Sequence, residues 1–236
     1  MLTSSVSHRQ LILDLGTPPA KTFKNFFAGA HGELVTRLAG LDAALSAGQT
    51  TDCTFYVWGG TGSGRSHLLE ALVGGTSSSR VRFIIPPSPL SAFSYDPNVV
   101  IYAVDDVNQL ADAQQIALFN LFNEVRSSRG SGLVVTGNAA PLNLAVREDV
   151  RTRLGWGLVF HLSALSDKDK AFVLQNAARE RGLTFVDDVT TWLLTHYRRD
   201  MPSLMSVLDK LDRFALEHKR TVTLPLLRTM LADNFK

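Results

Sequence analysis

A glycine-rich segment of the chain has the composition of a loop that binds phosphate groups. Glycines let backbone N–H groups curl around phosphate oxygens, and a helix that starts directly after the loop adds partial positive charge. The pattern G-x-x-x-x-G-K-[ST] is matched except that Arg65 stands where lysine is expected, and Ser66 stands where a Mg²⁺ ligand is expected. A simple Gly-rich turn is the alternative. We predict that these residues bind a nucleotide: Gly59, Gly60, Thr61, Gly62, Ser63, Gly64, Arg65, Ser66 and His67.

The arginine in this loop changes the expected chemistry. Its guanidinium keeps the positive charge of lysine but is a planar fork rather than a compact ammonium. We therefore expect Arg65 to preserve nucleotide binding while slowing or abolishing hydrolysis. The protein is accordingly expected to be an inefficient ATPase on its own.

Polar residues follow two apolar runs that read as strands. Asp105 and Asp106 come directly after the run 99–104, which predicts that Asp105 holds Mg²⁺ and that Asp106 orients the attacking water. A strand-end turn rich in aspartate is the alternative. Asn138 follows the run 132–136 and is the first candidate for sensing a γ-phosphate, with Thr136 the second and a simple turn the alternative.

Two arginines lie shortly before the last predicted strand. Arg151 and Arg153 stand in the segment 149–157, and an arginine placed across a subunit boundary can act on the nucleotide of a neighbour. Such a residue is called an arginine finger. The alternative is a surface ion pair with Asp149 or Glu148, which would contribute little to stability.

The elements that position these residues follow from hydrophobic periodicity. Strands alternate with helices up to residue 164, which predicts a parallel sheet covered on both faces, and only helices follow. We expect an arm (1–20), an α/β nucleotide-binding domain (21–164) and a small all-helical lid (165–236). The predicted strands are 53–58, 81–85, 99–104, 132–136 and 159–162, and the predicted helices are 34–45, 66–73, 113–126, 167–181, 187–196, 203–218 and 224–231.

Composition excludes several classes of protein. The net charge of +2 gives no strong electrostatic signal for nucleic acid binding across the whole chain. A single cysteine, Cys53, excludes a disulfide framework and suits a reducing compartment. The N-terminal residues do not have the pattern of a secretory signal, and no apolar run is long enough to span a bilayer. We expect a cytoplasmic protein with no membrane association.

The arm carries a short apolar motif. Residues 10–15 read Gln-Leu-Ile-Leu-Asp-Leu and are separated from the rest by a turn-rich stretch ending in Pro18-Pro19. A polar anchor followed by spaced leucines can dock into an apolar pocket of a partner. The alternative is an edge strand or a contact with a second copy of the chain. The predicted docking residues are Gln10, Leu11, Leu13 and Leu15.

These motifs resemble the AAA+ core of the DnaA/Hda family over about residues 10–236. The Arg65 version of the P-loop, and a sequence that ends after the helical lid without a helix-turn-helix domain, are similar to the Hda branch of that family. The resemblance is carried by Lys21-Thr22-Phe23-Lys24-Asn25-Phe26, Gly64-Arg65-Ser66-His67-Leu68, Asp105-Asp106, Val135-Thr136-Gly137-Asn138 and Arg153-Leu154-Gly155-Trp156-Gly157.

The resemblance implies a negative regulator of chromosomal replication initiation. Such a protein binds an adenine nucleotide, ADP preferred over ATP, and works with the DNA-loaded sliding clamp, the β subunit of DNA polymerase III. It stimulates ATP hydrolysis by the initiator DnaA, so it meets DNA only indirectly, and a homodimer is left open. The resemblance makes Arg153 the arginine finger in trans, and it makes Gln10, Leu11, Leu13 and Leu15 the clamp-binding residues.

One position departs from the family pattern. Related proteins carry a sensor II arginine at the start of the third lid helix, where this chain has Pro202. Arg198 and Arg199 are near but out of register, so ATP sensing is expected to be weak. The competing functions are a DnaC-like helicase-loading ATPase and a truncated DnaA-like initiator. Arg65 and Pro202 argue against the first, and the near-neutral charge argues against the second.

Overall fold

Short runs of β-branched and aromatic residues form a parallel sheet of five strands in the order β2-β3-β4-β1-β5. The central strands are buried on both faces, as expected for a sheet covered by crossover helices. The predicted α/β fold with a parallel sheet and a following helical lid is confirmed. The strands are β1 (Thr54–Trp58), β2 (Val81–Ile84), β3 (Ile101–Val104), β4 (Gly132–Gly137) and β5 (Leu158–His161).

The computed structural model describes residues 20–48, 52–128, 130–183, 185, 187–218 and 223–233. The chain divides between Ala164 and Leu165 into two compact units, and each is considered by itself. The predicted docking residues Gln10, Leu11, Leu13 and Leu15 lie outside the described residues. Every helix in the described part of the chain is too short or too polar to cross a lipid bilayer.

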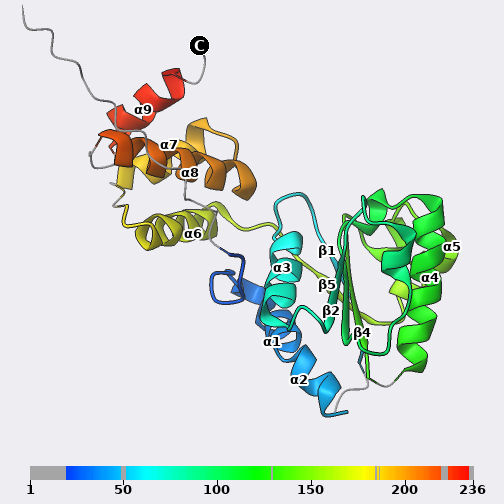
Figure 1. Ribbon diagram of the computed structural model, residues 1–236. Helices are drawn as coiled ribbons and strands as arrows, with labels where there is room; N and C mark the ends of the chain where they lie inside the picture. The colour runs from blue at the N-terminus through cyan, green and yellow to red at the C-terminus, as the bar shows by residue number, and fades with distance from the viewer. Residues whose placement is uncertain are drawn as a thin grey trace, which may run out of the picture. The chain divides into compact units, whose positions relative to one another are not determined.

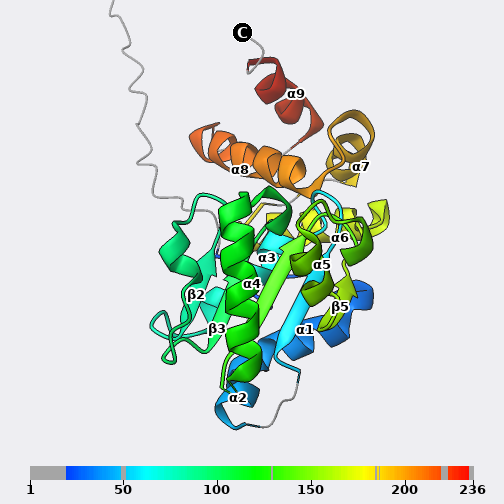
Figure 2. The same ribbon diagram turned by 90° about the vertical axis from the view of Figure 1, so that its right-hand side faces the viewer.

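Helices cover both faces of the sheet (Figures 1 and 2). On one face α1 (Gly32–Ala39), α2 (Leu41–Ser46) and α3 (Arg65–Gly75) enclose a leucine-rich core. On the other face α4 (Asp112–Ser127) and α5 (Glu148–Leu154) enclose a second core that contains aromatic residues. The sheet is therefore a rigid platform, and the loops that leave its strands are held on both sides.

The prediction of one helix over residues 34–45 is wrong. The structure has two helices there, α1 and α2, which are separated at Gly40. Glycine costs a helix about 1 kcal/mol relative to alanine because it loses more backbone freedom on folding. Burial of Leu38 and Leu41 on either side of the break fixes both short helices against the sheet.

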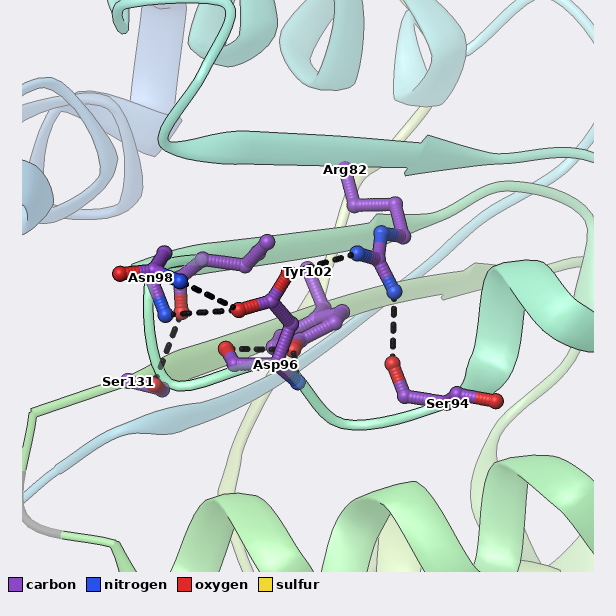
Figure 3. A network of polar contacts seen from close by, with 7 residues as sticks. Arg82, Ser94, Asp96, Asn98, Tyr102 and Ser131 are labelled. Carbon is purple, nitrogen blue, oxygen red and sulfur yellow. Dashed lines mark hydrogen bonds and ion pairs between the residues drawn. The ribbon is translucent and has the colours of Figure 1, made fainter.

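The connection between β2 and β3 is pinned by a polar network around Asp96 (Figure 3). Arg82 on β2 donates to the carbonyl of Ser94 at 2.6 Å and pairs with the Asp96 carboxylate at 3.4 Å. The same carboxylate accepts from the backbone and side-chain N–H groups of Asn98 at 2.9 and 3.0 Å, and the Tyr102 hydroxyl on β3 donates to the Asp96 carbonyl. The network fixes the start of β3 and therefore the position of Asp105 and Asp106, which follow its last residue.

The second unit is built from helices alone. They are α6 (Asp167–Glu180), α7 (Asp187–His196), α8 (Met201–His218) and α9 (Leu224–Asp233). Ser166 caps α6 by accepting from the Asp169 N–H at 3.1 Å, and Asp200 accepts from the Ser203 N–H at 2.9 Å at the start of α8. Their shared core contains Leu174, Val189, Leu193, Leu204, Leu208, Leu211 and Leu227.

Candidate functional site: a phosphate loop and an exposed arginine

The predicted nucleotide residues converge at one edge of the sheet because parallel strands end on the same side. Trp58, the last residue of β1, is in register with Gly137 of β4, and Val104, the last residue of β3, is in register with Val135. The P-loop, the aspartate pair and the segment after β4 therefore leave neighbouring strands side by side. Ligands of α/β sheets bind at this carboxyl edge.

Two glycines of the P-loop stand where a larger residue would not fit. Gly64 is the N-cap of α3 with φ +100°, and a Cβ there would lie 2.8 Å from the Phe26 ring. A Cβ on Gly59 would overlap the carbonyl oxygen of Leu162 and the Ser63 hydroxyl. Packing alone thus requires glycine at these two positions of the motif.

Asp105 is held rigidly at the end of β3. It is 7% exposed, and its Oδ1 accepts both the Thr136 hydroxyl and the backbone N–H of Asp106, the latter at 3.1 Å. Thr136 itself is 1% exposed. The second sensor candidate therefore orients the carboxylate predicted to hold Mg²⁺, a contact that the sequence pattern did not indicate.

Asp106 is tied to the P-loop arginine. Arg65 Nη1 lies 3.2 Å from Asp106 Oδ1, with the two side chains 11% and 28% exposed. Gln109 Nε2 donates to the other carboxylate oxygen at 3.1 Å. Asp106 has φ +47°, a left-handed backbone that few non-glycine residues adopt, aspartate more often than most. The carboxylate predicted to orient water is thus held by a cation and an amide.

The remaining predicted residues at this edge face in different directions. The Asn138 side chain is exposed, and its backbone N–H donates to Asn108 Oδ1 at 3.1 Å. The His67 ring instead faces the segment before α1, where its Nε2 lies 3.1 Å from both the Thr22 carbonyl and Asn25 Oδ1. Burial lowers the pKa of His67 below its ordinary value, so the ring is neutral at pH 7.

Lys21 adds a second tie between this segment and α3. Its ammonium pairs with Glu70 at 2.7 Å, and the Phe26 ring meets the His67 ring edge-on at a centroid distance of 5.3 Å. The segment 20–27 is consequently fixed against the first turns of the P-loop helix.

The chemistry of this edge fits a nucleotide phosphate and its Mg²⁺. Ser63 Oγ and Arg65 Nη1 are buried and have no hydrogen-bond partner among the described residues, although Arg65 lies near Asp106 in an ion-pair geometry. Buried donors without acceptors are costly and suit an anionic ligand. Backbone N–H groups at the start of α3 add partial positive charge. Ser66 and Asp105 supply the oxygen ligands that Mg²⁺ prefers.

Arg153 occupies a different environment, in the last turn of α5. Its guanidinium carbon lies 3.9 Å from the ring centroid of Trp156 and 5.2 Å from that of Phe119. The sequence left open an ion pair of Arg151 or Arg153 with Asp149 or Glu148. Among the described residues, Asp149 instead pairs with Arg147 at 2.8 Å. The sequence predicted no role of its own for Trp156, which was named only within the motif 153–157; its position three residues after Arg153 is the signal that could have indicated the contact.

The lid unit carries the departure noted in the sequence. Pro202 lies in the first turn of α8, where its fixed φ and missing N–H are tolerated. Arg198 pairs with Asp200 at 3.3 Å, and Arg199 lies 3.7 Å from Asp167 at the start of α6. Both arginines have acidic neighbours within their own unit.

Comparison with known proteins gives the family. A family model described as the Hda lid domain matches residues 167–231. An uncharacterized protein of Haemophilus influenzae is 33% identical over 186 residues, which cover 75% of this chain and 80% of that protein.

Solved structures have the same fold. Domain III of the Thermotoga maritima replication initiation protein DnaA superposes with a TM-score of 0.74 at 22% identity, over 92% of this chain and 98% of that one. AMPPCP-bound DnaA from Aquifex aeolicus gives 0.66 at 19% identity, over 85% and 67%. A Thermotoga maritima RuvB mutant gives 0.67 at 14% identity, over 90% and 71%. With the matching lid, the sequence relative and the P-loop sheet, the chain belongs to the DnaA/Hda family of AAA+ proteins.

Proposed function

We propose that this protein is a nucleotide-bound adaptor that switches off replication initiation by stimulating ATP hydrolysis on DnaA. In this proposal the nucleotide is ADP, held by the P-loop, with Mg²⁺ on Ser66 and Asp105. The protein would act in the cytoplasm together with the sliding clamp loaded on DNA. The clamp would be bound by Gln10, Leu11, Leu13 and Leu15 of the arm.

The Arg65–Asp106 pair is the observation that carries the proposal. A motor or loading ATPase needs a carboxylate free to orient water beside the γ-phosphate. Here the candidate carboxylate is held by Arg65 at 3.2 Å and by Gln109 at 3.1 Å. Pro202 at the start of α8 also leaves no arginine at the sensor II position. Both features favour a chain that keeps its nucleotide as a structural ligand.

Arg153 supplies the activity of the proposed adaptor. A guanidinium inserted at the phosphates of a neighbouring ATPase stabilises the charge that develops in phosphoryl transfer, an effect worth about 10³–10⁵-fold in rate. Arg153 lies at the end of a helix, outside the P-loop edge of its own chain, and makes no ion pair within the described residues. These features suit a residue that acts in trans.

Stimulation of a partner tests the function directly. We expect DnaA-bound ATP to be hydrolysed faster when this protein and DNA-loaded clamp are both added, and not when either is left out. The Arg153→Ala variant should lose the stimulation while retaining ADP binding. Fast ATP hydrolysis by this protein alone, without DnaA, would instead support a helicase-loading ATPase.

Nucleotide choice and the clamp arm need separate measurements. Calorimetric titration should give tighter binding of ADP than of ATP, and a tenfold preference for ATP, about 1.4 kcal/mol, would contradict the ADP proposal. Replacing Gln10, Leu11 and Leu13 by alanine should abolish clamp binding without changing the melting temperature. A lower melting temperature with clamp binding intact would make the arm structural.

A further inference from the structure

At the end of α5, the guanidinium of Arg153 contacts the aromatic rings of Trp156 and Phe119. The Arg153 guanidinium carbon is 3.9 Å from the ring centroid of Trp156, which is 55% exposed. Arg153 Nε is buried and has no hydrogen-bond partner in the described chain. The guanidinium therefore lies against the rings of Trp156 and Phe119, and no carboxylate among the described residues forms an ion pair with it.

Stacking and ion pairing use different parts of a guanidinium. A cation over an aromatic ring is attracted through the flat face of the guanidinium, whereas carboxylates and phosphates are bound by the N–H groups along its edge. A stacked arginine can consequently bind a phosphate without first giving up another acceptor. An arginine held by an ion pair must break that pair before it binds a phosphate.

We propose that Trp156 is a positioning residue for the arginine finger. Its indole face holds the Arg153 guanidinium in one plane, with the edge donors available to a phosphate on a neighbouring ATPase. The inference rests on the proposed function, because it assigns to Arg153 a role in trans. A free arginine side chain loses rotamer entropy when it is immobilised, and the indole removes part of this loss before the partner arrives.

Arg126 provides a matched control. Its guanidinium carbon lies 5.5 Å from the same indole and 6.0 Å from the Phe122 ring. Arg126 contacts the Trp156 indole from the last turn of α4, whereas Arg153 lies on α5. Arg126→Ala therefore removes one cation from the Trp156 indole and leaves the contact between Trp156 and Arg153 in place.

A spectroscopic measurement tests the stacking without any partner. Ring currents of the indole should shift the Nε–Hε resonance of Arg153 in a ¹H–¹⁵N spectrum of the full chain, assigned by its loss in Arg153→Lys. Trp156→Ala should move the resonance to the position of a free arginine, Trp156→Phe should leave a smaller shift, and Arg126→Ala should change it little. A resonance that does not respond to Trp156→Ala would overturn the proposal.

The second measurement separates positioning from partner contact. DnaA-bound ATP hydrolysis is followed while each variant is titrated in the presence of DNA-loaded clamp. Trp156→Ala should lower the maximal rate by about tenfold and leave the half-saturating concentration unchanged, with most of the rate restored in Trp156→Phe. Arg126→Ala should behave like the unaltered chain.

The alternative outcomes differ in what they overturn. If Trp156→Ala raises the half-saturating concentration at an unchanged maximal rate, Trp156 is a partner contact and the positioning role is wrong. If Arg153→Ala itself stimulates normally, Arg153 is not the arginine finger and the positioning role of Trp156 fails. The proposed function fails as well only if Arg151→Ala also stimulates normally. If Arg153→Ala is inactive while Trp156→Ala is fully active, only the positioning role fails.

Discussion

The P-loop edge and the end of α5 each contain an arginine with a proposed role at a phosphate, and the two side chains have different partners. Arg65 is 11% exposed at its side chain, and its edge faces the Asp106 carboxylate at 3.2 Å. The guanidinium carbon of Arg153 lies over the Trp156 ring, 3.9 Å from its centroid. The Arg65 guanidinium forms an ion pair with a carboxylate of its own chain, whereas the Arg153 guanidinium contacts an aromatic ring.

The difference shows that the partner of an arginine determines whether its N–H groups remain available to a phosphate. An ion pair neutralises both members, so the Arg65–Asp106 contact lowers the readiness of the carboxylate to orient water. A π-stack neutralises nothing and leaves the N–H donors of Arg153 in place. The same residue type therefore suits retention of a nucleotide in one region and action on a neighbour in the other.

The largest expected effect is a loss of stimulated ATP hydrolysis when the planar guanidinium of Arg153 is replaced by a lysine ammonium of the same charge. Lysine can still stack its ammonium on Trp156, but it cannot donate two parallel hydrogen bonds. Arg153→Lys should therefore lower stimulated hydrolysis of DnaA-bound ATP by about 100-fold or more, within the range measured for arginine fingers. The rate is read in a single-turnover assay with DNA-loaded clamp. Arg151→Lys is the control, and a loss there with a normal Arg153→Lys would move the role to Arg151.

An arginine-to-lysine exchange in the P-loop should raise a hydrolysis rate instead of lowering one. Arg65→Lys replaces the planar fork by a compact ammonium that loses its hold on Asp106 and still contacts phosphates. ADP affinity should stay within about fivefold, and ATP hydrolysis by the chain alone should rise about tenfold as Asp106 is released. The double variant Arg65→Lys with Asp106→Asn should return to background. An unchanged rate in Arg65→Lys would mean that the ion pair does not limit hydrolysis.

A smaller effect is expected for nucleotide affinity. Asp106→Asn should strengthen ADP binding, measured by calorimetry without Mg²⁺, by about fivefold, because the guanidinium no longer has to leave a carboxylate. In an Arg65→Ala background the same substitution should change affinity less than about twofold. Equal gains in both backgrounds would mean that Asp106 acts by simple repulsion of the phosphates.

The smallest effect is a pH dependence of stability to which His67 on the P-loop helix contributes. Burial lowers the pKa of His67 in the folded chain, so the unfolded chain binds the proton more tightly. Stability should therefore fall as pH drops below about 6.5, the ordinary value for histidine, and should be constant above it. Urea unfolding at pH 7.5 and 5.5 should show the loss, and His67→Gln should reduce it. The indole of Trp156 carries no ionisable group, so the ring-current shift on the Arg153 resonance should be the same at both pH values.

Local sequence was sufficient to predict the strands, most helices and the P-loop. A run such as Thr54–Trp58 followed by glycines has few alternatives, because β-branched and aromatic residues favour a buried strand and glycines favour the turn. The single helix expected over residues 34–45 failed because the leucine spacing continues across Gly40, and periodicity alone does not register the break. The roles predicted for Arg153, Asn138 and the arm stay predictions.

What the sequence determined by itself was the set of chemical groups and the edge at which they meet. The carboxyl ends of parallel strands share one side of a sheet, so Gly59, Asp105 and Asn138 had to lie near one another. Only the tertiary structure decided which groups pair there. Thr136 bonds Asp105, Arg65 faces Asp106, and His67 faces Thr22 and Asn25. It also placed Arg153 on Trp156. These contacts depend on side-chain directions and on packing between distant segments, and a linear pattern carries neither.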